Sequence, residues 1–536
     1  MKKSIRIILL ILLLNMGVGA QNVESSFELK WDKVQSPSPK YNISDCAILK
    51  CDSNNVYYYL NTFKGQFKNT YFNYLVEYDR KKNTHNLLEI TKNSGDDKLT
   101  YLKYDTINNE FHYFSYLHNR KDKKLYLYVD TYDYVKLIKK NEIKKVVEVD
   151  LSDKGSEVLN VFLIHDNGRF MFRYTCNSNK GRFNGLEVLN RNMDKEWSTY
   201  VMAQTEEGYN IESNYRIDNE GNVYAIQRNF EKGSDINLHY DRSRVWVVCY
   251  PKDGTKPISQ PLLLKDKNFI PTVQLSTNYK NEVICAGLYS MPGTESVVGA
   301  FSFIIEPLLT NIDHINYKEF SKELIVKGYD TKKAEKDINS IINKKDFEKN
   351  FGYNLNKIHY RNDNGFDIIA EKYYKVIETQ IDNGVSYEAY HYHYYDDLWV
   401  LNFNPDGTFK WIQKIPKYEY VINNYNLIGS YFLYYDQNNS FNFIFNIAKS
   451  KKNVIQMPVT NSTTVCVKLD ENGNEKFFEL INDNEISKTF APRYCSKISD
   501  NEILTTCLNF ANAPYNGMGV IRKKDNSISF GTLKLK

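Results

Sequence analysis

The segment from Ser386 to Lys417 carries strand-like runs joined by an Asp-Gly turn, and shorter forms of this pattern recur along the chain. A run that alternates polar and aromatic residues is expected to turn at Asp396-Asp397 into a strand from Leu398 to Phe403. A second turn, Asn404 to Gly407, leads into a strand that carries Trp411. Period-two runs joined by an Asp-Gly turn are a strong hairpin signal. Their recurrence predicts a repeated all-β architecture.

The recurring units favour a β-propeller. Short strand-like runs, broken by Asn, Asp or Lys, begin at Ser44 and continue to Ser527 to Lys536, a last strand that we expect to close the ring. Propeller blades take about 40 to 50 residues each, which allows more than eight in this chain. Because long hairpins and a helical insertion use part of the chain, we predict seven blades, with eight as the alternative. A pair of β-sandwiches is disfavoured, since the unit recurs over the whole length.

Single stretches add detail to this prediction. The run from Leu159 to Thr175 is a clear hairpin with Asn167-Gly168 at its tip, where a tight turn requires positive φ. The run from Val297 to Glu306 is nearly all apolar and is expected to be a central strand. The lead from Gln21 to about Tyr41 shows no regular pattern and is predicted to be irregular.

Two segments depart from the strand pattern. Between about residues 317 and 352, the run from Lys332 to Phe351 has the three-and-four apolar spacing of an amphipathic helix. This helical insertion is interpreted as a brace on the outside of the barrel rather than a lid over a site. The second segment, Tyr373 to Tyr395, is a long hairpin tipped at Asp382-Asn383-Gly384. Neither of its faces is aliphatic, so we expect it to project from the body.

The first twenty residues have the features of a secretory signal peptide. A basic start is followed by an apolar run from Ile7 to Leu14 and by small residues up to Ala20. The apolar run is too short to span a bilayer, so we expect export of a single domain, residues 21–536, to the periplasm, cell surface or medium. Its net charge of about +2 argues against nucleic acid or an anionic membrane as the main partner.

Cysteine and tyrosine usage leave alternatives open. Most of the eight cysteines lie in apolar strand-like runs, where a free cysteine acts as a small hydrophobe. Only Cys46 and Cys51 are close in sequence, and a disulfide between them is the less favoured alternative. The 43 tyrosines suit either glycan-binding platforms or half-exposed strands in a chain of AT-rich composition, and the second interpretation is favoured.

Three patterns carry a resemblance to known sequences. They are an NxGNVY turn at Asn219 to Tyr224, a GxYS strand with an apolar GxFxF strand at Gly287 to Ser290 and Gly299 to Phe303, and the YYDD unit that continues through a tryptophan to IPK, Tyr394 to Lys417. Through these patterns, most of the chain after residue 20 resembles a group of secreted β-propeller-like proteins from Bacteroidota to which no activity is assigned. The resemblance implies fold and compartment only.

The strongest candidates for a ligand-binding site lie on the long hairpin. Tyr390, His391, His393 and Asp396 include the residue types of a divalent metal site. A metal site also needs ligands from other strands, and none is recognised, so we predict neither a metal nor any other cofactor. Asp396 and its neighbour Asp397 point to opposite faces of a strand, which does not suit paired acid-base chemistry. No GxSxG, HExxH, Walker or GxGxxG motif is present, and no catalytic residue is predicted.

Three functions fit these observations. We favour a non-enzymatic binding or scaffold protein of the cell envelope, which holds a protein or glycan by a propeller face or by the long hairpin. The alternative is a glycan-active enzyme, a glycosidase or polysaccharide lyase, with catalytic residues drawn from separate blades. A purely structural part of the envelope is the third. We expect a monomer that does not insert into the membrane after signal cleavage.

Overall fold

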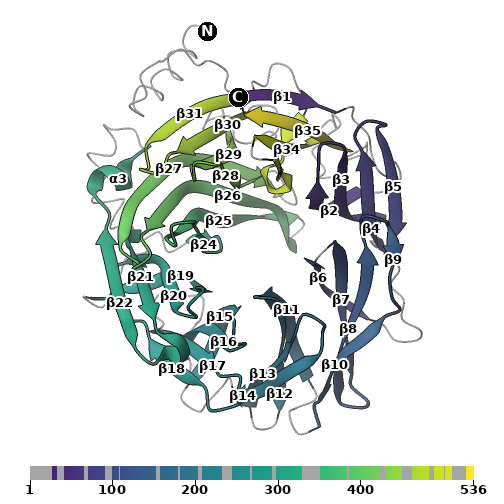
Figure 1. Ribbon diagram of the computed structural model, residues 1–536, viewed down its shortest axis with the longest axis vertical. Helices are drawn as coiled ribbons and strands as arrows, with labels where there is room; N and C mark the ends of the chain where they lie inside the picture. Colours follow the sequence, from purple (N-terminus) through teal and green to yellow (C-terminus); the bar gives the residue numbers. More distant parts are fainter. Residues whose placement is uncertain are drawn as a thin grey trace.

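The structure of the protein is a computed structural model that describes residues 27–32, 42–64, 70–90, 99–107, 109–152, 157–178, 181–202, 208–231, 244–265, 268–291, 297–328, 351–382, 385–422, 429–448, 462–481, 488–499, 501–509 and 527–535. Within them, the strands form eight antiparallel sheets of four or five strands, and the sheets stand as blades in a ring (Figure 1). The predicted all-β propeller is confirmed. The preferred count of seven blades is wrong, and the alternative of eight is correct.

The first four blades follow the chain, each from its innermost strand outwards. Blade 1 comprises β2 (Asn42–Cys51), β3 (Asn55–Lys64), β4 (Thr70–Asp79) and β5 (Thr84–Glu89). Blade 2 comprises β6 (Thr100–Ile107), β7 (Glu110–Asn119), β8 (Lys124–Asp133), β9 (Ile138–Lys139) and β10 (Lys144–Asp150). Blade 3 comprises β11 (Glu157–Asp166), β12 (Arg169–Ser178), β13 (Gly181–Leu189) and β14 (Lys195–Met202), and blade 4 comprises β15 (Gly208–Ile217), β16 (Val223–Glu231), β17 (Arg244–Tyr250) and β18 (Ile258–Pro261).

The next four blades complete the ring. Blade 5 comprises β19 (Phe269–Thr277), β20 (Val283–Ser290), β21 (Val297–Ile305) and β22 (Ile312–Glu319), with the 3-10 helix η3 (Pro307–Leu309). Blade 6 comprises β23 (Phe351–Leu355), β24 (His359–Tyr360), β25 (Phe366–Asp382), β26 (Val385–Phe403) and β27 (Phe409–Ile422). Blade 7 comprises β28 (Tyr431–Tyr435), β29 (Phe441–Ala448), β30 (Ser462–Leu469) and β31 (Glu475–Ile481), and blade 8 comprises β32 (Lys488–Phe490), η7 (Pro492–Tyr494), β33 (Ser496–Ser499), β34 (Glu502–Asn509), β35 (Ser527–Leu535) and β1 (Phe27–Trp31).

The two ends of the chain close the ring together. The strand β1 pairs with β35 and forms the outer strand of blade 8, so this blade combines both ends of the described chain (Figure 1). Arg80 of blade 1 secures the joint: its guanidinium donates to Asp32 at 2.8 and 2.9 Å and to the Thr532 hydroxyl at 2.7 Å. Closure by the last strand was predicted. The prediction that the lead is irregular is wrong for Phe27 to Trp31, because these residues form β1, the outer strand of blade 8.

Two segments that were not assigned to blades in the sequence account for the eighth blade. The long hairpin is not an addition to the blades, since β25 and β26 are the second and third strands of blade 6. The segment β1 also belongs to a blade and not to a lead. Both segments therefore contribute to the repeat, and the chain accommodates eight units.

Tight turns give the ring two distinct faces. In blades 1 to 7, consecutive antiparallel strands place the turns between first and second strands, and between third and fourth strands, at one end of the blade, which we call the turn face. The Asn167-Gly168 tip lies there, with φ of 46° and 69° as predicted. Asp218 organises the turn of blade 4, because its carboxylate accepts the backbone N–H groups of Glu220, Gly221 and Asn222. The opposite end, where the second and third strands connect, is the loop face.

The core lies between neighbouring blades. Phe301 and Phe303 of β21 share one buried cluster with Val245 and Val247 of blade 4, and every residue of β20 and β21 is buried. The prediction of a central apolar strand from Val297 is confirmed. Hydrogen bonds also join neighbouring blades: the indole N–H of Trp197 in blade 3 donates to the Gly221 carbonyl of blade 4 at 3.0 Å.

The structure describes only part of the predicted helical insertion. Residues 317–319 belong to β22 and residues 351–352 to β23, so both predicted limits were wrong. Between them, α3 (Lys322–Val326) begins at Ser321, whose hydroxyl accepts the Leu324 N–H. The buried Lys414 of β27 donates to the Ile325 carbonyl at 2.9 Å, which fixes α3 against blade 6. The rest of the helix predicted from Lys332 lies outside the described residues.

The signal peptide predicted for residues 1–20 also lies outside the described residues. In the part of the chain that is described, no helix has the length and apolar character needed to cross a membrane. None of the eight cysteines, all of which lie in the described residues, forms a disulfide, so Cys46 and Cys51, both on β2, are not bridged.

Candidate ligand-binding surface on the loop face

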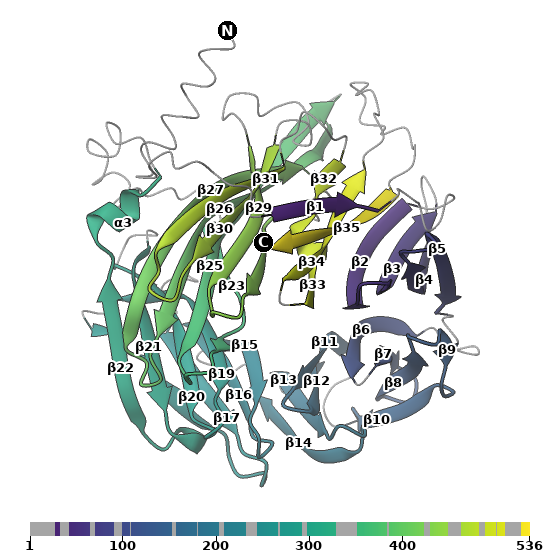
Figure 2. The same ribbon diagram turned by 45° about the horizontal axis from the view of Figure 1, so that its top comes forward.

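The hairpin predicted from Tyr373 to Tyr395 is part of an unusually long strand pair. The strands β25 and β26 have 17 and 19 residues, and they lie beside the 14-residue β27 in blade 6 (Figure 2). The connection between β25 and β26 joins second and third strands, so the hairpin tip belongs to the loop face. The side chains of residues 378–390 lie outside the described part, and this range includes the candidate Tyr390.

Aromatic pairs cross the hairpin on both of its faces. On one face, the rings of Tyr373 and Tyr395 are 5.2 Å apart. On the other, the rings of Tyr374 and Tyr394 stack at 4.4 Å and 6°. Cross-strand aromatic pairs each contribute about 0.2 to 1 kcal/mol to a sheet. They therefore stiffen the base of the hairpin, where these two pairs lie.

The two candidate histidines lie on the Tyr373 face. His391 is opposite Ile377, and His393 is opposite Lys375. The Nδ1 atom of His393 is 2.8 Å from the Tyr373 hydroxyl. Burial, with the positive charges of Lys375, His391 and Arg493, holds the pKa of His393 below its ordinary value. In the described residues, no group of three or more His, Cys, Asp or Glu side chains is placed to hold a metal ion.

The candidate Asp396 does not lie in a turn. The strand β26 continues through it, and the register shifts between Asp396 and Leu398, so the predicted turn at Asp396-Asp397 is wrong and a β-bulge takes its place. Asp396 lies opposite Tyr418. Burial and the charge of Asp396 raise the pKa of Tyr394, and burial, Tyr394 and Asp396 together raise the pKa of Tyr418. Asp397 pairs instead with Lys414, 2.8 Å away. The bulge thus leaves the two carboxylates with separate partners.

A buried ionic network lies beside this bulge. The Nζ atom of Lys417 on β27 is 2.7 Å from Glu371 of β25 and 2.9 Å from Glu419 of β27. Ser430 completes the network: its hydroxyl donates to Glu371 at 2.6 Å and its N–H donates to Glu419 at 2.9 Å. The Lys417 side chain is 0% exposed, and the two glutamates are 3% and 7% exposed. These charges are held in place by one another, inside the protein.

The network also joins blade 6 to its neighbours. The Lys417 ammonium lies over the ring of Phe445 in blade 7 at 5.7 Å and over the Tyr395 ring at 5.4 Å. The guanidinium of Arg493 in blade 8 covers the same Tyr395 ring at 5.2 Å. Tyr395 is buried in one cluster with Tyr58 of blade 1. The base of the long hairpin is therefore fixed against three other blades.

The electrostatics of the network predict a pH dependence of stability. Burial, opposed by Lys417 and assisted by Glu371, raises the pKa of Glu419 from 4.5 to about 7. The folded protein then keeps a proton that the unfolded chain releases, so this contribution is complete below about pH 4.5 and is lost as the pH rises to 7. We expect wild type to lose about 2 to 3 kcal/mol more than Glu419→Gln between pH 5 and pH 8, measured by urea unfolding. Parallel pH profiles of the two proteins would contradict this assignment.

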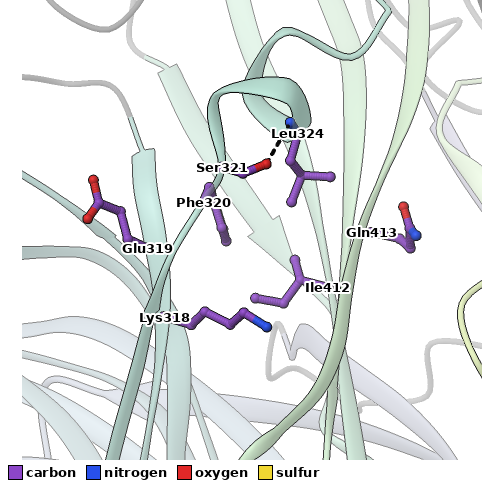
Figure 3. A pocket seen from close by; sticks show the side chains of 7 residues that line it. All are labelled: Lys318, Glu319, Phe320, Ser321, Leu324, Ile412 and Gln413. Carbon is purple, nitrogen blue, oxygen red and sulfur yellow. Dashed lines mark hydrogen bonds between the residues drawn. The ribbon is translucent and has the colours of Figure 1, made fainter.

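Two hollows flank the loop-face end of strand β22. The α3 hollow, about 290 Å³, lies between β22, α3 and β27 and is lined by Lys318, Glu319, Phe320, Ser321, Leu324, Ile412 and Gln413. The Tyr317 hollow, about 520 Å³, lies on the other side of β22 and is lined by Leu264, Lys265, Asn268, Tyr289, Met291, Val298, Tyr317 and Glu319. Figure 3 shows Lys318 directed toward Ile412 in the α3 hollow, and Glu319 directed to the opposite side of the strand.

Sequence reasoning found the hairpin but missed both the network and the hollows. Lys417 belongs to the IPK pattern noted above, yet nothing in that pattern shows that two glutamates meet it. The hollows arise from the meeting of neighbouring blades. The only sequence signal near the Tyr317 hollow is weak: Ile315 and Tyr317 stand two residues apart, as on one face of a strand, in an otherwise polar run.

Comparisons with known proteins agree with a propeller and go no further. No protein-family model and no curated protein matches the chain. Among solved structures, the β-propeller domain of the Trilobed protease from Pyrococcus furiosus has 10% identity and a TM-score of 0.33, with 83% of this chain and 99% of that chain covered. The WD40 domain of SCAP from fission yeast has 10% identity and a TM-score of 0.32, with 96% and 99% covered.

An enzyme is also among the similar structures. The GH93 α-L-arabinofuranosidase of Fusarium graminearum has 9% identity and a TM-score of 0.31, with 65% of this chain and 93% of that chain covered. At TM-scores this low, none of these likenesses carries an argument about activity or ligand. The blade count rests on the strand pairing of this chain.

Proposed function

We propose that this protein is a secreted, non-enzymatic binding or scaffold protein of the cell envelope, which recognises a protein or glycan through the loop face that carries the long hairpin. The observation that carries the proposal is the anchoring of this hairpin. Its aromatic strands extend beyond an ordinary blade, and the Lys417 network fixes their base against blades 7, 8 and 1. A rigid aromatic surface loses little conformational entropy on binding, which favours recognition.

The chemistry of the hairpin base supports binding over reaction. Glu371 and Glu419 are buried carboxylates at the base of the hairpin, and both contact the ammonium of the buried Lys417. Their arrangement has the features of a structural ion network, in which the buried Lys417 stabilises the charges of both carboxylates. The hairpin instead offers tyrosine and histidine side chains, which combine flat apolar faces with polar tips. Export is supported by the pattern of residues 1–20.

A binding screen with a matched control tests this function. The mature chain, residues 21–536, is applied to a glycan array with and without divalent metal ions, and to an envelope extract in a pull-down. The same screen uses His391→Ala/His393→Ala on the hairpin and Tyr279→Ala on the turn face, where Tyr279 is 67% exposed. We expect a ligand whose binding is lost in the hairpin variant and kept in the turn-face variant. Ligands that bind both variants equally would contradict recognition by the hairpin.

A further inference from the structure

A half-exposed apolar surface on blade 5 marks a second region of interest on the loop face. Ile315 and Tyr317 follow each other on one side of the outer strand β22, and each is 47% exposed. Tyr317 lies opposite Phe301, which is completely buried among residues of blade 4. The outer strand of blade 4, β18, has only four residues. It is too short to cover the outer part of blade 5, and Tyr317 stays exposed for this reason.

The Tyr317 hollow combines aromatic and polar groups drawn from two blades. Tyr289 and Tyr317 supply aromatic walls from blade 5. Lys265 and Asn268 come from the connection between blades 4 and 5, and Glu319 comes from the end of β22. Burial, with the nearby charge of Glu319, raises the pKa of Tyr289 to about 12, so this hydroxyl stays a proton donor. The hollow of about 520 Å³ has the size of small-molecule sites, which are roughly 300 to 1,000 Å³.

The charges in the hollow indicate the class of ligand. One ammonium, from Lys265, and one carboxylate, from Glu319, line it, so the hollow selects neither an anion nor a cation. Together with the Asn268 amide and the Tyr289 hydroxyl, they present both donors and acceptors. A flat tyrosine ring beside such groups suits a ligand with an apolar ring face and many hydroxyls. We infer that the Tyr317 hollow binds one or two rings of a neutral oligosaccharide.

This inference does not depend on the hairpin. The hollow lies between blades 4 and 5, whereas the hairpin belongs to blade 6 and contacts blades 7, 8 and 1. The two sites share only the loop face. Either site can therefore fail a binding test without affecting the other, and variants at each identify which surface a ligand uses.

The test is a calorimetric titration of the mature chain with linear hexasaccharides of glucose, xylose, mannose and arabinose, one at a time. We expect at least one to bind, with an affinity reduced about tenfold or more in Tyr317→Ala through loss of the ring contact. In Glu319→Gln, we expect a loss of about tenfold from the weaker hydrogen bond. The control is Ile315→Ala, which removes a side chain of equal exposure on the same strand, outside the hollow. Its affinity is expected to equal that of wild type.

Three results would overturn the inference. The first is that none of the four sugars binds at 10 mM, about the weakest affinity that such a titration detects. The second is a sugar affinity that Tyr317→Ala leaves unchanged, while His391→Ala/His393→Ala abolishes it, which assigns the sugar to the hairpin. The third is binding of an extended peptide, selected from a display library, that is lost in Tyr317→Ala while no sugar competes. Circular dichroism and the thermal midpoint of each variant show whether it is folded.

Discussion

Replacing Lys417 with methionine is expected to lower the free energy of unfolding by about 3 to 5 kcal/mol. The substitution keeps most of the side-chain volume but leaves Glu371 and Glu419 in the interior without the ammonium that lies 2.7 and 2.9 Å from them. An uncompensated buried charge is among the costliest changes that a folded protein can undergo. The measurement is urea unfolding of residues 21–536 at pH 8, followed by tryptophan fluorescence.

The control for this variant is Lys468→Met in blade 7. Lys468 pairs with Asp436 at the same distance, 2.7 Å, but its side chain is 32% exposed. Solvent screens such a pair, and its loss is expected to cost less than about 1 kcal/mol. A second variant, Lys417→Met/Glu419→Gln, removes one of the two stranded charges and is expected to recover part of the lost stability. Equal effects of Lys417→Met and Lys468→Met would show that the network does not anchor blade 6.

Removing β1 is expected to open the ring. A chain that begins at Lys33 lacks the five residues that pair with β35, and it lacks Asp32, the partner of Arg80. Loss of about four backbone hydrogen bonds costs on the order of 4 kcal/mol, and the edge of β35 is left unpaired. We expect a lower urea midpoint and concentration-dependent association in gel filtration, since an open strand edge pairs with other chains.

The point variant Arg80→Met tests the same joint without shortening the chain. It removes a guanidinium that holds β1 to blade 1, and about 2 kcal/mol of stability is expected to be lost. Lys534→Met is the control, because its ion pair with Glu502 is also in blade 8 but is 48% exposed at the lysine. An unchanged urea midpoint for both the shortened chain and Arg80→Met would mean that the terminal strands do not hold the ring closed.

Turns and central strands were the part of the fold that the sequence predicted well. The Asn-Gly turn at Asn167-Gly168 requires positive φ at both residues, and few other sequences adopt it at so little cost. The run from Val297 is apolar at almost every position because β21 is covered on both sides by neighbouring strands and blades. Such signals are local, since they depend on a few adjacent residues.

Three outer strands, β1, β18 and β22, were missed because their patterns are weak. The strand β22 has eight residues, of which only Ile312, Ile315 and Tyr317 are apolar or aromatic. The other five are charged or polar, and most positions of the strand are exposed. The strand β18 has four residues, too few for any periodicity to show. The strand β1 is recognisable only through its partner β35, which lies at the other end of the chain. Counting blades from sequence therefore failed by one.

The candidate site was found only in part, for a similar reason. His391 and His393 share a face as strand alternation requires. The bulge at Asp396 and the meeting of Lys417 with Glu371 depend on the register of three strands, which a single sequence does not specify. The Tyr317 hollow depends on the length of a strand in the neighbouring blade. Contacts between units of a repeat are not encoded in any one unit.

The most direct test of recognition by the loop face is site-specific photo-crosslinking. A benzophenone derivative of phenylalanine is placed at His391 on the hairpin or at Tyr279 on the turn face, and each protein is irradiated in an envelope fraction. The account predicts a discrete adduct from position 391 that is absent without light and absent from position 279. An adduct from position 279 with none from position 391 would contradict it and would move the recognition surface to the opposite face of the propeller.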